Sequence, residues 1–485
     1  MVVKMSKTLT REQALQIVPD GCKVNWHNKT LRWYAYTATN FYDPVAKRSK
    51  EKRVTIGHID ESGQFVYSKH YLMTQKLHEL QAGDDSHSQN TIEILSSQAD
   101  KLVNDPRKNP NRCIYKLHHV LIISILASLG GQTSAVGIAD YWRTHHEFLK
   151  SILPDLPQQN ISHDTVRRLL CLLEPTEILK VLKSALDDFY QKLPQAVISM
   201  DGQMIRATRN SAQGCDGRYV LNFYDTDCGL ALFQELVGEK KSEVSHAKAI
   251  VKSLDLAGCI VTADALHTKT AFVKELCRAK ADYCLAVKKN NKTLYNEMAD
   301  GFEFSKTITQ TLEASVEKGH GRLETRQIYL LPTTILSEST RKQWQGLEEG
   351  TLVKCVAERT QMSTGETSTD IRYFICSLDF NHRYIGEQIK RAVRRHWAVE
   401  NELHYVLDVD FQQDKTQCKN MNYLQNRTTL NKIGFNYISQ LRTLQEEETG
   451  KSSDSVKRMM IGLNTPKAAL EAITKILSQA RLQNS

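Results

Sequence analysis

Between residues 195 and 290 the sequence alternates apolar, strand-like runs with amphipathic helical segments, a pattern that few folds accommodate. The run "AVISMDGQ" precedes a hairpin pattern, "RYVLNFYDTDCGLALFQELVG", with its turn at Asp225–Gly229. A helical segment then leads into "CIVTADA", and a second helix, 267–280, leads into "DYCLAVK". The order strand, strand, strand, helix, strand, helix, strand predicts an α/β fold with a mixed sheet covered by helices.

Two of these predicted strands end in an aspartate. The first strand closes with Asp201 and the strand "CIVTADA" closes with Asp264. Side chains at the carboxyl ends of neighbouring strands emerge at the same edge of a sheet, where ligands bind. Taken singly, each aspartate is better explained as a turn or helix-cap residue.

A third carboxylate lies in the segment "GEQIKRAVRRHWAVENELHYVLD", which we predict to be one helix. At roughly 100° per residue, one face of this helix gathers Val393, His396, Trp397, Glu400, Leu403, His404 and Leu407. A different face gathers Lys390, Arg391, Arg394 and Arg395. The first face is mostly apolar and should point inward. An ionised glutamate in its middle is costly unless it is paired with a cation or a metal ion.

Asp201, Asp264 and Glu400 together offer the oxygen ligands that Mg²⁺ or Mn²⁺ prefers. Two such ions about 4 Å apart can activate water or a 3′-hydroxyl in phosphodiester transfer. A zinc site of His396, Glu400 and His404 is a weaker alternative, because it lacks the HExxH order and a fourth ligand. The acids that follow, Asp408 and Asp414, are alternative or supporting ligands.

Residues 91–190 are helical by their periodicity. The segment "NISHDTVRRLLCLLEP" opens with Ser162 as a predicted N-cap and Asp164 in the first turn, followed by Arg167 and Arg168. A short helix with basic residues near its start, preceded by another helix, fits a DNA-reading helix-turn-helix. A plain helical bundle is the alternative.

The density of aromatic and β-branched residues in 1–80 predicts a small β-rich unit with a turn at Asp60–Gly63. Its basic residues are Lys47, Arg48, Lys50, Lys52 and Arg53, and they follow the aromatic residues Trp33, Tyr34, Tyr36 and Tyr42. Such side chains can bind a nucleic-acid backbone and stack on bases. The alternative is a solvated hairpin whose aromatic residues form its core.

Length and charge limit the class of protein. The 485 residues correspond to roughly three domains, and the net charge of +9 favours an anionic partner. The longest apolar run, "VLIISILASL", is about half the length that a membrane span needs. Eleven scattered cysteines without a CxxC pair argue against a zinc ribbon or a disulfide framework. We therefore expect a reducing compartment, the cytoplasm or the bacterial nucleoid.

Several motifs resemble those of bacterial insertion-sequence DDE transposases, in the branch that contains the H-repeat-associated proteins. They are "VISMDGQMIRATR", "CIVTADALHTKT", "DYCLAVKKNNKTLYNEM", "KGHGRLETRQIYLLP" and "HWAVENELHYVLDVDFQQDKTQ". The stretch from "NPNRCIYKLHHVLIISILASLGG" to "ISHDTVRRLLCLLEP" resembles the helical domain that precedes catalysis in this branch. Residues 1–80 are not typical of it.

The resemblance implies a ribonuclease H-like catalytic domain over 195–445, with a β insertion at about 290–383 and a C-terminal helical tail at 446–485. It assigns the catalytic, metal-binding acids to Asp201, Asp264 and Glu400. It also implies Mg²⁺ or Mn²⁺, two ions, double-stranded DNA as partner and a homodimer on paired DNA ends.

The implied function is binding of element ends, hydrolysis of phosphodiesters and strand transfer into target DNA. Related groups carry Tyr, Arg and Lys around the glutamate where this chain has Val393, His396 and Leu407, so His396 is left as a substitute phosphate contact. Our other DNA-contact candidates are Lys288, Lys289, Lys292, Arg391, Arg394, Arg395, Arg167 and Arg168. Trp344 is either a base-stacking or a core residue. A catalytically silent DNA-binding protein and a structure-specific nuclease are the alternatives.

Overall fold

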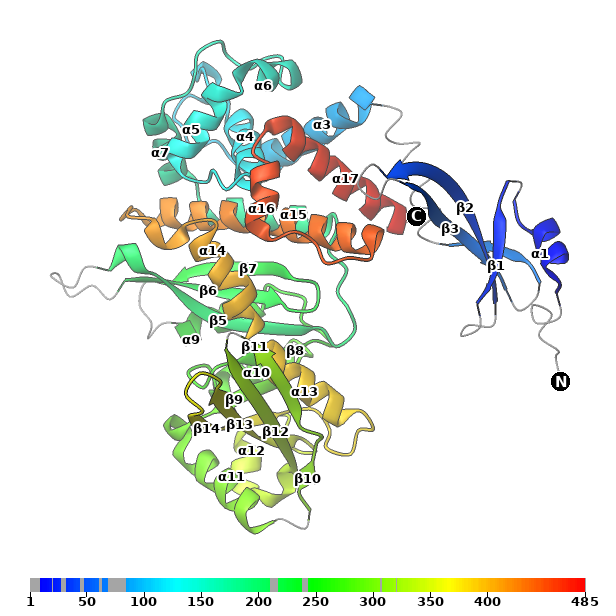
Figure 1. Cartoon of the computed structure of the whole chain (residues 1–485). Helices are drawn as coiled ribbons and strands as arrows, with labels where there is room; N and C mark the ends of the chain where they lie inside the picture. Colours follow the sequence, from blue (N-terminus) through cyan, green and yellow to red (C-terminus); the bar gives the residue numbers. More distant parts are fainter. Residues whose placement is uncertain are drawn as a thin grey trace. The chain divides into compact units, whose positions relative to one another are not determined.

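The computed structural model describes residues 9–19, 21–27, 32–43, 48–60, 63–68, 84–209, 217–237, 243–305, 308–319 and 321–484. Residue contacts divide the chain into two compact units (Figure 1). The first comprises residues 1–91, 445–451 and 474–485, and the second comprises 92–444 and 452–473. Every described helix is too short or too polar to cross a lipid bilayer.

The first unit contains a four-stranded antiparallel sheet in the order β1-β2-β3-β4. Its elements are α1 (Arg11–Ile17), β1 (Lys23–His27), β2 (Arg32–Asp43), β3 (Arg48–Ile59) and β4 (Phe65–Tyr67). The predicted turn between β3 and β4 is confirmed: the Gly63 N–H donates to the Asp60 carbonyl at 3.1 Å. Trp33 packs against the core of this sheet, whereas Lys47 lies outside the described residues.

The second unit begins with helices. They are the part of α3 (Asp84–Leu102) from residue 92 on, α4 (Leu117–Leu129), α5 (Ala135–Thr144), α6 (His146–Ile152), α7 (His163–Leu172) and α8 (Pro175–Asp187). Twelve of the thirteen residues of α4 are buried, as its apolar sequence predicts. The predicted N-cap of α7 is confirmed, because Ser162 Oγ accepts from the Thr165 N–H at 3.2 Å.

A ten-stranded mixed sheet forms the centre of the second unit (Figure 1). Its strands are β5 (Val197–Ile205), β6 (Arg218–Asp225), β7 (Leu230–Val237), β8 (Ile260–Ala263), β9 (Asp282–Val287), β10 (Gln310–Thr311), β11 (Ser315–Gly319), β12 (Arg322–Pro332), β13 (Thr351–Gln361) and β14 (Thr367–Cys376). The order is β10-β12-β13-β14-β9-β8-β5-β6-β7, and β11 pairs with β12. The pairs β5–β8 and β8–β9 are parallel, and the other pairs are antiparallel. The predicted mixed α/β architecture is confirmed.

The strands after residue 290 continue this sheet, because β14 pairs with β9 over Tyr373–Cys376. The helices interleaved with the strands are α9 (Glu243–Val251), α10 (Thr270–Arg278), α11 (Lys292–Phe304) and α12 (Glu338–Gln343). Those that follow are α13 (Ile385–Arg395), α14 (Tyr405–Val409), α15 (Met421–Thr449), α16 (Val456–Gly462) and α17 (Pro466–Asn484). Trp344 is 3% exposed, which confirms its role in the core.

Two contacts anchor helices to this sheet. The buried face of α13 packs on residues of β8, β9 and β12–β14, including Ile260 and Phe374. At the opposite edge, the Asn436 side chain on α15 donates to the Ala231 carbonyl and accepts from its N–H, at 3.0 and 2.8 Å. Because β7 is an edge strand, this amide satisfies backbone groups that no further strand pairs with.

Candidate active site

Asp201 and Asp264 are brought together by the parallel pair β5–β8. The last paired residues of this ladder are Met200 and Ala263, so both aspartates occupy the next position along adjacent strands. Adjacent strands lie about 4.8 Å apart. We predicted that strand β5 ends at Asp201, and that prediction is wrong. Strand β5 continues to Ile205 through antiparallel pairing with β6. Asp201 marks instead the end of the parallel pairing.

Glu400 lies on a segment that departs from the single regular helix predicted for it. Helix α13 ends at Arg395, and a π-helical turn, Val399–His404, precedes α14. A π turn holds more residues than an α turn, so it rotates the side chains that follow. Leu403 is buried, but Glu400 is exposed; the prediction that Glu400 is buried within the apolar face is wrong.

The three carboxylates line one cavity of about 580 Å³. The remaining lining residues come from β9 and its following loop, from α11, from β14 and from the end of α13: Ala286, Val287, Lys288, Lys289, Tyr295, Asp370, Ile371, Arg372, Tyr373, Phe374, His396 and Trp397. The cavity therefore combines an acidic floor with at least three basic side chains.

The pKa of Glu400 is raised. Partial loss of hydration at its carboxylate is the largest cause, although the residue as a whole is exposed; Arg372 opposes this effect, and the negative charge of Asp264 adds to it. A divalent cation between the carboxylates would relieve this repulsion, and hard oxygen donors suit Mg²⁺ or Mn²⁺. The ligand atoms of the three acids do not all lie within 4.8 Å of one another.

Two neutral histidines flank the trio. Burial lowers the pKa of His396 to about 4, and its Nδ1 lies 3.3 Å from Thr262 Oγ1. Burial lowers the pKa of His404 to about 3; its Nε2 lies 2.9 Å from the Asn222 amide nitrogen, and its Nδ1 lies 3.7 Å from Asp201 Oδ2. With these separate partners the two rings do not form the alternative zinc site with Glu400.

The acids after Glu400 belong to other contacts. Gln203 donates to Asp408 at 2.8 Å, and burial raises the pKa of Asp408 to about 6. Asp414 accepts from the Arg206 N–H at 3.0 Å and pairs with its side chain at 3.2 Å. Neither acid lines the cavity of the trio.

The basic candidates separate into two groups. Lys288 and Lys289 line the cavity, whereas Lys292 begins α11 outside its lining. The others have acidic or backbone partners within the chain. Arg391 pairs with Asp227 at 3.1 Å, Arg394 with Glu317, Arg395 with Glu402 at 3.8 Å and Arg167 with Asp164 at 3.3 Å, and Arg168 donates to the Asp164 carbonyl at 3.3 Å.

Our sequence analysis missed Arg372 and Asp370. Residues two apart in a strand share a face, and Phe374 on the same face of β14 is part of the core beneath α13. The sequence signal for Arg372 was its position two residues before the apolar Phe374, which places both on one face of a strand. This signal did not indicate a site, because the sequence does not show that β14 lies beside β9.

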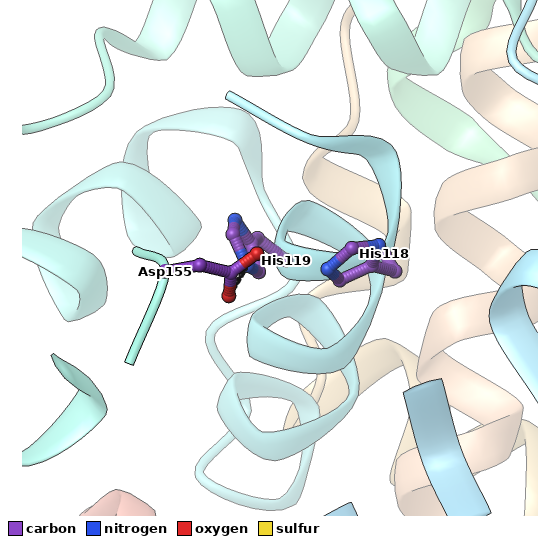
Figure 2. Close-up of side chains that lie close together, drawn as sticks. All are labelled: His118, His119 and Asp155. Carbon is purple, nitrogen blue, oxygen red and sulfur yellow. Dashed lines mark hydrogen bonds and ion pairs between the residues drawn. The ribbon is translucent and has the colours of Figure 1, made fainter. Parts of the chain in front are cut away.

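A second cluster lies in the helical region, where ring nitrogens of His118 and His119 and an oxygen of Asp155 lie within 4.8 Å of one another (Figure 2). Each member has a protein partner. Asp155 accepts from Lys116 at 2.5 Å and lies 2.8 Å from His119 Nε2, while His118 Nδ1 lies 3.1 Å from Asp100. Burial raises the pKa of Asp155, but the hydrogen bonds from Lys116 and His119 outweigh this effect and lower it to about 2. We interpret the cluster as an ion-pair network that anchors the start of α4.

Behind the sheet, Lys432 on α15 is completely buried, and its amine donates to the Gln234 side chain. Burial lowers the pKa of Lys432 to about 7, although Asp408 acts in the opposite direction. In the unfolded chain the pKa of this lysine is near 10.4. Between pH 7 and 9 its amine is therefore protonated in the unfolded chain and largely deprotonated in the folded chain. The contribution of Lys432 to stability should therefore increase with pH, by at most about 1.4 kcal/mol per unit.

Lys432→Met should remove this dependence. The measurement is thermal unfolding of variant and wild type at pH 7, 8 and 9. The difference in Tm between the two proteins should change with pH, because only the wild type carries the contribution of Lys432. The matched control is Lys419→Met, since Lys419 is exposed. A Tm difference for Lys432→Met that stays constant across the three pH values would contradict the expectation.

Comparison with known proteins gives consistent matches. A family model described as "Transposase DDE domain" matches residues 192–436, and one described as "DDE_Tnp_1-associated" matches 101–184. Two similar proteins of Escherichia coli K12 are "Putative protein YbfL", 26% identical, and "H repeat-associated putative transposase YhhI", 25% identical. Both alignments cover 67% of this chain and 85% of the relative. A solved piggyBac transposase synaptic complex with hairpin DNA matches at 12% identity and a TM-score of 0.38, over 78% of this chain and 76% of that one; this likeness is too low for an argument.

Proposed function

Because this chain belongs to the transposase DDE domain family, we propose that it is a DNA transposase that cleaves phosphodiesters and joins 3′-hydroxyls to target DNA. One observation carries the proposal: Asp201, Asp264 and Glu400, which are 63 and 136 residues apart in sequence, line the same cavity. Lys288 and Lys289 on the wall of that cavity suit a polyanionic substrate.

The sheet supports a ribonuclease H-like interpretation. The strands β7-β6-β5-β8-β9 run as an antiparallel meander followed by two parallel strands. We assign residues 195–445 to this catalytic fold, with β10–β14 as its β insertion. The regions 1–80 and 91–190 are the proposed binders of DNA ends, and 446–485 is the helical tail.

Asp201, Asp264 and Glu400 would hold divalent ions, which we propose to be two Mg²⁺ or Mn²⁺. Such ions, when bound, make water or a 3′-hydroxyl a stronger nucleophile and stabilise the leaving oxygen. The chain's own part is to hold its carboxylates ionised and oriented. His404 lies beside Asp201 as a neutral ring, which leaves the negative charge of the carboxylate intact.

Lys288 and Lys289 would neutralise phosphate charge at the mouth of the site. We further propose that a homodimer assembles on paired element ends and acts on DNA of the bacterial nucleoid in the cytoplasm. Arg391, Arg394, Arg395, Arg167 and Arg168 would contact DNA only by exchanging their present acidic or backbone partners for phosphates.

The function is tested with the purified full chain and DNA that contains the element ends, identified as short inverted repeats flanking the coding region. We expect nicking and strand joining with Mg²⁺ or Mn²⁺ and neither with EDTA. Tight binding without turnover in either metal would favour a catalytically silent DNA-binding protein. Nicking without joined products would favour a structure-specific nuclease.

A further inference from the structure

The wall of the cavity formed by β14 carries a guanidinium held by contacts on two sides, next to Lys288 at the end of the β9–β14 pairing. Arg372 on β14 lies with its Cζ 4.5 Å from the centroid of the Trp397 ring. Its Nε donates to Asp370 Oδ2 at 2.7 Å. Stacking on an aromatic ring and a hydrogen bond at Nε together fix the plane of a guanidinium.

The terminal nitrogens of Arg372 remain available to a ligand. Within the described part of the chain, this side chain hydrogen-bonds to Asp370, and the bond uses Nε alone. The side chain is 31% exposed and lines the cavity of the trio. No ion pair within 4.0 Å joins it to the described carboxylates of Asp201, Asp264 or Glu400. Among the residues that the structure describes, its one ion pair is therefore with Asp370, through Nε, and leaves the terminal nitrogens toward the acidic trio.

His396 cannot supply this charge. The sequence left it as a phosphate contact, but its low pKa keeps the ring neutral at pH 7, and its Nδ1 faces Thr262. Arg372 is by contrast always protonated. Arg372 and Glu400 line the same cavity, so the guanidinium lies beside the acidic trio.

We propose that Arg372 binds the DNA phosphate beside the acidic trio through its two terminal nitrogens, with Trp397 and Asp370 as positioning residues. A fork of two N–H donors matches two phosphate oxygens. This proposal rests on the proposed function, because it names the group that receives the DNA at that site. It places a phosphate-binding residue on β14, 28 residues before Glu400.

The test compares Arg372→Lys and Arg372→Ala with wild type. Lysine keeps the charge but loses the fork and the stacking plane. We expect the nicking rate at saturating DNA to fall about 10-fold for lysine and about 10²-fold for alanine. DNA binding without catalysis, measured by anisotropy in EDTA, should show a salt slope reduced by about 1 for alanine and unchanged for lysine.

Two further variants test the positioning. Trp397→Leu removes the aromatic face and should resemble Arg372→Lys, whereas Trp397→Phe keeps a face and should restore most of the rate. The matched control is Arg383→Lys, since Arg383 also stacks on an aromatic ring, at 5.4 Å from Tyr384, but is exposed and outside the cavity. It should leave the nicking rate and the salt slope unchanged.

The outcomes separate this proposal from the proposed function. If wild type nicks DNA but Arg372→Ala keeps both its rate and its salt slope, the assignment of Arg372 is wrong and the transposase function stands. If wild type shows no metal-dependent nicking, the function itself fails. If alanine lowers Tm and the rate but lysine retains the wild-type rate, charge alone suffices and the forked contact is refuted.

Discussion

Replacing Asp201, Asp264 or Glu400 singly by its amide is expected to reduce metal-dependent DNA cleavage by about 10³-fold or more. The amide keeps the size of the side chain but removes the negative charge that a divalent ion requires. Since three acids act as one unit, a double variant such as Asp201→Asn with Glu400→Gln should be little worse than either single one. Gel-based nicking with Mg²⁺ and Mn²⁺ measures the effect.

DNA binding in EDTA should survive all three substitutions, because it depends on the basic side chains. Asp408→Asn is the matched control, since Asp408 contacts Gln203 and does not line the cavity. It should nick DNA at close to the wild-type rate. Cleavage that persists in Glu400→Gln and disappears in Asp408→Asn or Asp370→Asn would move the third ligand to that acid.

The second large effect is expected at Gly434, in the middle of α15. A Cβ added at this glycine would lie 2.7 Å from the Ser128 carbonyl oxygen and 2.9 Å from its carbon, on the backbone of α4. Backbone cannot rotate out of the way as a flexible side chain can. Gly434→Val should therefore push the two helices apart and cost about 3 kcal/mol or more.

Calorimetric or circular-dichroism melting should show a Tm several degrees lower for Gly434→Val. The matched control is Gly462→Val on α16, where an added Cβ meets no atom within 4 Å. Gly462 is the last residue of α16, where propensity matters little, and in a helix interior Val has a better propensity than Gly, so a lower Tm for Gly434→Val reflects the helix–helix contact. Equal melting temperatures for the two variants would show that α4 and α15 do not approach as closely as described.

The features that were predictable from the sequence are those fixed by residues close together in the chain. The strands around Asp201 and Asp264 were recognisable because buried strands are continuous apolar runs, and the cap at Ser162 was recognisable because capping is a contact within one turn. The Asp225–Gly229 turn was equally local, and it is confirmed by the Gly229 N–H donating to the Asp225 carbonyl at 2.9 Å.

Glu400 shows where local pattern fails. A period of 3.6 residues placed it among apolar side chains, but α13 ends at Arg395 and a π turn follows. Leu403 lies in the core as the pattern predicts, whereas Glu400 is exposed and lines the cavity. The periodicity argument assumes an unbroken helix. It singled out Glu400, which lines the cavity, but it wrongly predicted that Glu400 is buried.

By itself, the sequence determined the order of strands and helices and the identity of three separated acids, since both are written in short runs of residue type. Only the tertiary structure decided what surrounds those acids. Arg372 contacts Trp397 because β14 pairs with β9 and α13, which precedes Trp397, packs on the face of the sheet that these strands form. The pKa of His396 is lowered because the packed chain removes much of the water from its ring. Pairings between distant segments and loss of hydration depend on the whole fold, and no local pattern of residues contains them.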